Sequence, residues 1–243
     1  MACSYSLFIL GSFSGQDRRM NGINNLFKKA LVTVKSVINL LAAGNSCDAV
    51  ILWRHLHELE CVLITLNTKG EELFFRYVEH MEYFDLETKP NAEELQKRLS
   101  EESKAYGIKE KNAFINYGWL VHVEGFREGF GKEYRLNFKE GLQKVAGQSG
   151  RYAAYASASK ILHPSAWVVA IPDDKFYLFT LLELSKTLTN IVGLIKDYIV
   201  RYRQFSSKIA ECDSYARTID SYLRMIARNN RIAAAKYTRR TAK

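Results

Sequence analysis

Proline and cysteine are scarce in this 243-residue chain, which contains three prolines and four cysteines. Because proline interrupts helices, its scarcity leaves room for long uninterrupted elements. The cysteines stand far apart, without the paired spacing of a zinc site or of a disulfide-stapled secreted domain. We therefore expect no metal site, no cofactor and no disulfide framework. The four cysteines are Cys3, Cys47, Cys61 and Cys212.

Long apolar runs are also missing, because charged residues interrupt each stretch well before the roughly 18 residues that a membrane span needs. The short apolar run over residues 5–10 has no basic residue ahead of it, so it does not have the pattern of a signal peptide. An apolar fraction of 47% is too high for a disordered chain. We expect a soluble, cytoplasmic protein that does not contact a membrane.

Charge is distributed unevenly along the chain, whose net charge is +9. Residues 196–243 contain twelve Lys and Arg against four Asp and Glu, which leaves residues 1–195 close to neutral. This surplus indicates either a surface for RNA or another acidic partner, or a solvated last helix with a basic tail.

The hydrophobic periodicity is helical almost throughout. Apolar residues recur at three- and four-residue steps over 21–43 and again over 46–66, and Gly44 between them suits a helix end. The short link predicts an antiparallel hairpin of two long helices. No strand pattern is found. The sequence predicts an all-α, single-domain antiparallel bundle of six to eight helices with an irregular middle insertion.

We divide this single domain, residues 1–243, into four segments. The first holds the hairpin and a third helix over about 70–87, and the second a charged helix and an irregular insertion that we expect to form an exposed flap or lid. The third holds a tyrosine- and histidine-bearing helix and a long helix, and the last a basic helix and tail. Their ranges are 21–88, 90–137, 138–205 and 206–243.

Arg54 and Glu58 stand four residues apart in the second predicted helix, so they share one of its faces. Large apolar residues surround the pair, and a buried arginine needs a partner. The pair is either an intrahelical clamp that fixes packing, or a site where Arg54 holds a phosphate while Glu58 orients it or a histidine. His57 and Cys61 lack a second ligand pair, so we expect them in the core.

A second polar cluster, Tyr155, Ser159 and His163, follows i, i+4, i+8 spacing on the helix that precedes Pro164. This spacing aligns the three side chains along one ridge, and the small residues between them allow another helix to approach closely. Because histidine titrates near neutral pH, His163 is a candidate general acid or base. The alternative is a polar seam in which these groups bond across to Arg54 and Glu58.

Together the two clusters resemble a bacterial family known only as a domain of unknown function, numbered five-six-seven-seven. The shared pattern is an Arg-x-x-x-Glu pair on an early apolar helix and a later Tyr-x-x-x-Ser-x-x-x-His-Pro-Ser motif. Residues 138–147 fit the family's short helix before the tyrosine helix, and the resemblance covers residues 30–200. The matching positions are Arg54, Glu58, Tyr155, Ser159, His163, Pro164 and Ser165.

The all-helical form of that family is similar to the HEPN-type proteins of prokaryotic toxin and antiphage systems. Many of those are metal-independent ribonucleases with an Arg-x4–6-His motif on one helix, often assembled across a homodimer. This chain departs from the motif, because Arg54 and His163 fall on different predicted helices and no arginine precedes His163 by five to seven residues. The resemblance to HEPN proteins is thus one of fold, which does not by itself determine activity.

The resemblance implies a toxin-like or antiphage ribonuclease that needs no metal. In it His163 would move a proton to or from the RNA 2′-hydroxyl or the leaving oxygen, Arg54 would stabilise charge on the phosphate, and Glu58 would orient either of them. The residues implied to bind substrate are Tyr155, Ser159 and Ser165.

Two other functions stay open. The same residues could lock the bundle of a non-catalytic interaction module, whose basic C-terminal region binds a partner or nucleic acid. Alternatively, Arg54 could grip the phosphate or carboxylate of a small molecule in a hydrolase.

Overall fold

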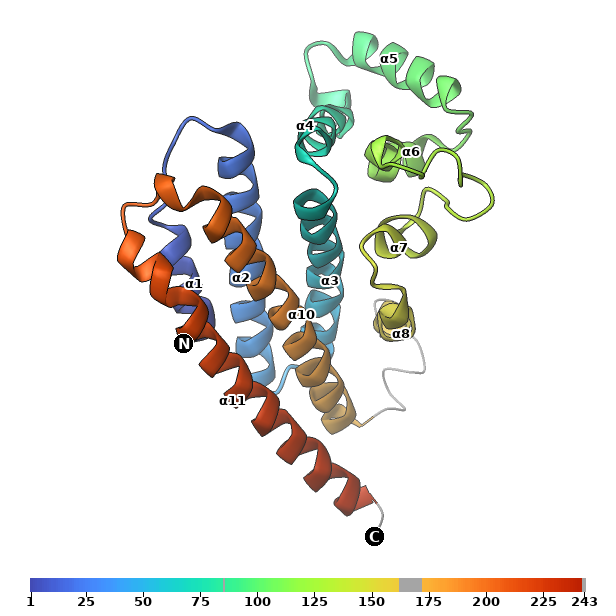
Figure 1. The fold of residues 1–243 in the computed structure, drawn as a ribbon. Coiled ribbons are helices and arrows are strands. Elements are labelled where there is room, and N and C mark those ends of the chain that lie inside the picture. Colours follow the sequence, from blue (N-terminus) through green and yellow to red (C-terminus); the bar gives the residue numbers. More distant parts are fainter. Residues whose placement is uncertain (85, 162–171, 242–243) are drawn as a thin grey trace. The chain divides into compact units, whose positions relative to one another are not determined.

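The computed structural model describes residues 1–84, 86–161 and 172–241 (Figure 1). Within these ranges the regular structure is helical, with ten α-helices, short 3-10 or π segments and no β-strand, which confirms the all-α prediction. There are more helices than the six to eight expected, because α1 (Ala2–Leu10), which is apolar with no single apolar face, and the short α6 (Lys111–Tyr117) were not predicted. The short helix expected near 138–147 is present as a π segment followed by α7 (Gln143–Val145). The chain forms two compact units, residues 1–63 with 153–243, and residues 64–152.

The first unit is a set of long helices that pack side by side. Helix α1 lies against α2 and α11, and α10 lies against the same two helices. Its core includes the fully buried rings of Phe27, Trp53 and Tyr198. Besides α1, the helices are α2 (Arg18–Ala42), α3 (Ser46–Thr68, up to Leu63), α8 (Tyr152–Ile161, from Ala153), α10 (Asp173–Tyr202) and α11 (Ile209–Thr241).

The turn between α2 and α3 is built around Gly44, as the sequence predicts. Its φ of 82° lies in the left-handed region, which glycine adopts without a steric penalty. This geometry lets the backbone N–H of Asn45 donate to the carbonyl of Leu40 at 2.9 Å, while Gly44 N–H donates to Leu41 at 3.2 Å. Both bonds satisfy carbonyls that the end of α2 leaves without helical partners.

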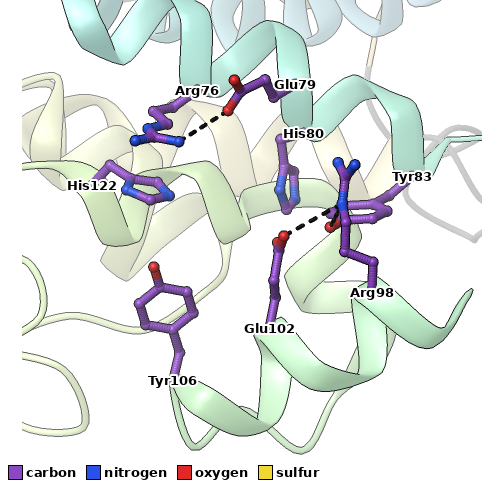
Figure 2. Close-up of a pocket in the computed structure, with 8 residues that line it drawn as sticks. All are labelled: Arg76, Glu79, His80, Tyr83, Arg98, Glu102, Tyr106 and His122. Carbon is purple, nitrogen blue, oxygen red and sulfur yellow. Dashed lines mark hydrogen bonds and ion pairs between the residues drawn. The ribbon is translucent and has the colours of Figure 1, made fainter. Parts of the chain in front are cut away.

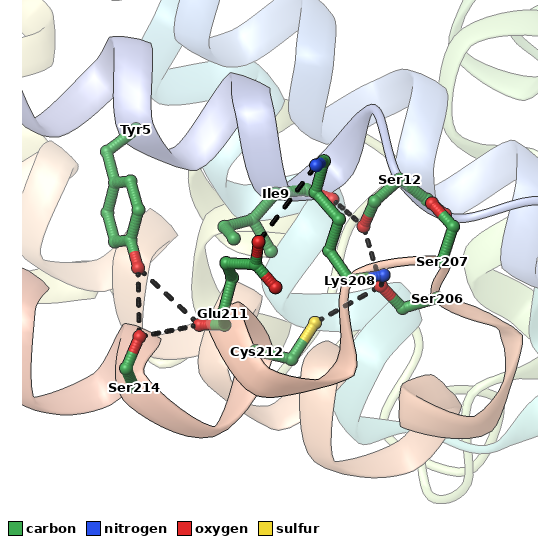
Figure 3. A network of polar contacts seen from close by, with 9 residues as sticks. All are labelled: Tyr5, Ile9, Ser12, Ser206, Ser207, Lys208, Glu211, Cys212 and Ser214. Carbon is green, nitrogen blue, oxygen red and sulfur yellow. Dashed lines mark hydrogen bonds and ion pairs between the residues drawn. The ribbon is translucent and has the colours of Figure 1, made fainter.

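The residues just after α1 are tied to those just before α11 by serine hydroxyls and backbone groups (Figure 3). Ser12 Oγ donates to the carbonyl of Ile9 at 2.6 Å and lies 2.6 Å from Ser206 Oγ. The backbone N–H of Ser207 donates to the carbonyl of Ser12 at 2.9 Å. These contacts join segments almost two hundred residues apart, which local periodicity does not reveal.

Helix α10, with the residues that follow it to Phe205, is long and apolar enough to cross a membrane by length and composition alone. Half of its most apolar window is buried inside the protein, however, and the helix packs against α2 and α11. The core helix of a globular protein meets the same two criteria.

The second unit consists of shorter elements. Helix α4 ends at His80, earlier than the predicted 87, and 3-10 turns replace its expected last part. The predicted charged helix is present as α5, whose buried side chains are Leu95, Leu99 and Ser103. With α6 and α7, the elements are α4 (Glu71–His80), η1 (Met81–Tyr83), η2 (Leu86–Thr88), α5 (Ala92–Ala105), η3 (Gly118–His122), η4 (Phe138–Leu142) and η5 (Ser149–Arg151).

His80 joins α4 to the following elements inside the second unit. Only 7% of the residue is exposed, and its Nε2 bonds the carbonyl oxygen of Phe114 at 2.5 Å. Its ring meets the rings of Tyr83 and Phe114 edge-on, each at 5.1 Å. Gly118 lies against the same ring, and a Cβ there would come within 2.5 Å of it. Burial lowers the pKa of His80 below its ordinary value.

The stability of the second unit should therefore fall as the pH drops below about 6.5, because the unfolded chain binds a proton that folded His80 resists. The free energy of unfolding of the wild type should fall between pH 7.5 and 5.5. In His80→Gln, whose side chain can still donate to Phe114, we expect this fall to be smaller by up to about 1 kcal/mol. Urea denaturation at the two pH values measures this. An unchanged pH dependence in the variant would show that His80 does not contribute.

Candidate functional site

Four of the predicted site residues meet where α3 lies beside α8, and Arg54 is at their centre. Its Nε donates to Ser159 Oγ at 2.9 Å, and its Nη2 donates to the hydroxyl of Tyr155. The same Nη2 lies 3.2 Å from Glu58 Oε1, one turn further along α3. The i, i+4 spacing on each helix therefore places two side chains from each side in one cluster, which we call the Arg54 cluster.

Tyr155 connects the two charges of the Arg54 cluster. Its hydroxyl accepts from Arg54 and donates to Glu58 Oε1 at 2.5 Å, so one oxygen bridges cation and carboxylate. The guanidinium carbon of Arg54 also lies 4.5 Å from the centre of the tyrosine ring, a cation–π distance. Ser159 Oγ in turn donates to the carbonyl of Tyr155 at 2.9 Å. The guanidinium plane is held at three points.

The Arg54 cluster is partly open to solvent. The side chains of Arg54 and Glu58 are 25% and 30% exposed, whereas Tyr155 is buried. A half-buried guanidinium beside two hydroxyls is suited to binding a phosphate, because it offers charge-assisted donors in a region of reduced dielectric. The partner carboxylate also neutralises the arginine, which serves packing equally well. This geometry is compatible with both interpretations of the pair.

A polar network centred on a fully buried carboxylate joins α3 to α10. Glu60 and His57 are both 0% exposed, and His57 Nδ1 lies 2.8 Å from Glu60 Oε2. Thr187 Oγ1 donates to the same oxygen at 2.9 Å, and Asn190 Nδ2 donates to Oε1 at 2.6 Å. The His57 ring stacks on Trp53 with its centre at 5.6 Å. His57 therefore belongs to the core, as predicted.

His163 and Ser165 lie outside the described residues, so their predicted roles stay predictions. In the part of the chain that the structure describes, no group of three or more His, Cys, Asp or Glu is arranged to hold a metal ion. Cys61 is buried.

The sequence analysis missed a second polar site, a cavity of about 170 Å³ inside the second unit (Figure 2). Helix α4 supplies Arg76, Glu79 and His80, and α5 supplies Arg98 and Glu102. The end of α5, η1 and η3 add Tyr106, Tyr83 and His122. A signal was present, because Arg98, Glu102 and Tyr106 repeat the i, i+4, i+8 spacing of the tyrosine–histidine helix.

Electrostatics in this cavity favour neutral imidazoles. Desolvation, and second the positive charge of Arg76, lower the pKa of His122, while burial lowers that of His80. Burial also raises the pKa of Tyr83 to about 12, so its hydroxyl stays protonated. Arg98 Nε donates to that hydroxyl at 2.9 Å.

A helical protein with a polar cluster shared by two helices is a broad class, and its fold alone names no activity. Within this class the chain belongs to the Family of unknown function (DUF5677), whose model matches residues 20–171. The matched range contains both halves of the Arg54 cluster, and it confirms the family to which the sequence motifs pointed. No curated protein and no solved structure matches the chain.

Removing the bridging hydroxyl tests how much the Arg54 cluster contributes to stability. We expect Tyr155→Phe to lower the free energy of unfolding by about 1 kcal/mol, the usual net value of such a hydrogen bond. Tyr177→Phe is the matched control, because Tyr177 is 43% exposed on α10. Urea denaturation measures both, and equal midpoints for the two variants would contradict a stabilising role.

The buried network should be far more sensitive than the Arg54 cluster. Glu60→Ala leaves the donors of His57, Thr187 and Asn190 without their acceptor, so we expect a loss of about 3 kcal/mol or more. Glu60→Gln retains one oxygen and should lose less. Glu211→Ala, at a glutamate of α11 whose side chain is 44% exposed, should change stability by less than about 0.5 kcal/mol. Thermal denaturation measures the melting temperatures of the three variants. We expect Glu60→Ala to melt lowest, Glu60→Gln next and Glu211→Ala highest, and any other order would be evidence against this network.

Proposed function

We propose that the protein is a metal-independent ribonuclease of the HEPN type, acting in the cytoplasm in a toxin-like or antiphage defence response. The observation that supports this proposal is the Arg54 guanidinium, held at three points and still one-quarter exposed. A positively charged group fixed in advance is what stabilises the charge that develops on a phosphate during transfer.

In this proposal Arg54 binds the scissile phosphate, and Glu58 orients Arg54 through the hydroxyl of Tyr155. Ser159, together with Ser165, positions the substrate. The sequence spacing puts His163 one turn beyond Ser159, and the proposal gives it the proton transfer.

The proposed chemistry needs no metal. His163 takes the proton of the RNA 2′-hydroxyl, and the 2′-oxygen attacks the neighbouring phosphorus. The bond from phosphorus to the 5′-oxygen breaks, and that oxygen takes up a proton. The products are a 2′,3′-cyclic phosphate and a free 5′-hydroxyl.

The second candidate is a non-catalytic interaction module. It is supported by the exposed arginines of α11, Arg224, Arg228 and Arg231, and by a stretch from residue 221 to 241 that contains no acidic residue. Such a surface suits RNA or another acidic partner, with affinity that falls steeply as salt rises. In that case the Arg54 cluster only stabilises the helix packing.

Cleavage of a labelled RNA by the purified full chain in the presence of EDTA distinguishes the two candidates. For a ribonuclease we expect Arg54→Ala to lower the cleavage rate about 100-fold or more, the usual effect of losing one transition-state donor. His163→Ala should abolish cleavage, and its melting temperature should stay unchanged. Products should carry a 2′,3′-cyclic phosphate.

Arg201→Ala is the matched control, because Arg201 is an exposed arginine of α10 in the same unit as Arg54. It should cleave at the wild-type rate. The interaction module would be favoured if the protein binds RNA but does not cleave it. In that case binding should be lost when Arg224, Arg228 and Arg231 are replaced by Gln. Cleavage that survives both Arg54→Ala and His163→Ala would refute the ribonuclease site.

A further inference from the structure

The cavity of the second unit is separate from the proposed ribonuclease site, and its walls carry charges of both signs. Arg76 and Arg98 balance Glu79 and Glu102, and both imidazoles are neutral near pH 7. Its lining therefore has no net charge. A purely anionic or purely cationic ligand is attracted by one pair of side chains and repelled by the other, so its net electrostatic binding energy is small. A ligand that carries both charges can place each one beside a side chain of opposite sign.

Each wall carries one charge of each sign, because Arg76 stands beside Glu79 on α4 and Arg98 stands beside Glu102 on α5. Figure 2 shows Arg76 on α4 across the cavity from Glu102 on α5, with the hydroxyl of Tyr106 directed into the space between them. Glu102 Oε1 is a long 3.5 Å from Arg98 Nε, which itself donates to the hydroxyl of Tyr83 at 2.9 Å. Glu102 also hydrogen-bonds the side chain of Tyr83, and its two carboxylate oxygens can still receive an additional donor from a ligand.

Arg76 can exchange its partners at little energetic penalty. It bonds Glu79 at 3.1 Å and Glu72 at 3.2 Å, and those carboxylates are 58% and 81% exposed. Exposed ion pairs of this kind contribute little to stability. Each of the two glutamates contacts one guanidinium nitrogen, and a ligand carboxylate can replace one of them at that nitrogen.

Size limits the ligand further. The cavity of about 170 Å³ is close to the roughly 150 Å³ that accommodates one benzene ring. A small amino acid therefore fits it. Tyr106 and His122, whose rings meet edge-on at 6.0 Å, provide an aromatic wall for a side chain.

We propose that this cavity binds a free α-amino acid as its zwitterion. Arg76 holds the carboxylate, Glu102 accepts from the ammonium group, and Tyr106 contacts the side chain. The second unit is then a sensor or binding site for a small metabolite, distinct from the Arg54 cluster.

Isothermal titration calorimetry of the full chain with each standard L-amino acid in turn tests the proposal. We expect at least one to bind with a Kd below about 10 mM. Propionate carries only the carboxylate and ethylamine only the ammonium, so each should bind at least about tenfold more weakly.

Two variants should remove binding, one for each charge of the ligand. Arg76→Gln and Glu102→Gln should each weaken it about tenfold or more, the usual effect of losing a hydrogen bond to a charged group. Both residues are substantially exposed, so the variants should keep the wild-type melting temperature. Glu101→Gln is the matched control, because Glu101 is the neighbouring glutamate of α5 and pairs with Lys97.

The proposal is overturned if no amino acid binds, if propionate or ethylamine binds equally well, or if Glu102→Gln and Glu101→Gln behave alike. Since the cavity residues take no part in the proposed cleavage of RNA, failure here leaves the ribonuclease assay unaffected, and the converse also holds.

Discussion

The carboxylate of Glu60 is the interaction on which the first unit most depends. It is completely buried, and it stays so because the side chains of His57, Thr187 and Asn190 all point their nitrogen or hydroxyl groups at it. A buried carboxylate that lost these partners would destabilise the fold, so α3 and α10 are held in one register. This register fixes the face that α3 turns toward α8, and Arg54 lies on that face.

Arg54 and Glu60 illustrate two environments on one helix. The Glu60 side chain is completely buried and stabilises the packing of α3 on α10. Arg54 also has several hydrogen-bond partners, but its side chain stays 25% exposed to water. A charged group that is oriented by its neighbours and still accessible can act on a substrate, because its position is fixed before the substrate arrives. This difference in exposure is the physical basis for treating the Arg54 cluster, and not the Glu60 network, as the candidate site.

The second unit contains a different combination of charges. Its cavity is lined by arginine–glutamate pairs and by two histidines whose pKa values are lowered, so it is polar and electrically balanced. The Arg54 cluster instead presents one cation to a partly open surface. Our proposals therefore assign a phosphate to the first site and a small molecule with both charges to the second, and each site lies within a single unit.

Local sequence determined much of this protein. Three- and four-residue spacing predicted the all-α class and the long helices, Gly44 predicted the end of α2, and i, i+4 spacing predicted which side chains would share a face. Those features depend on helix geometry within a few residues. Tertiary structure alone decided which faces meet, because packing depends on the shapes of surfaces far apart in sequence. It brought Ser12 to Ser206, and it enclosed the cavity between α4 and α5, where the sequence had indicated only a third helix and an exposed flap. The contact of Tyr155 with Arg54 was one of two alternatives that the sequence left open, and the tertiary structure shows it.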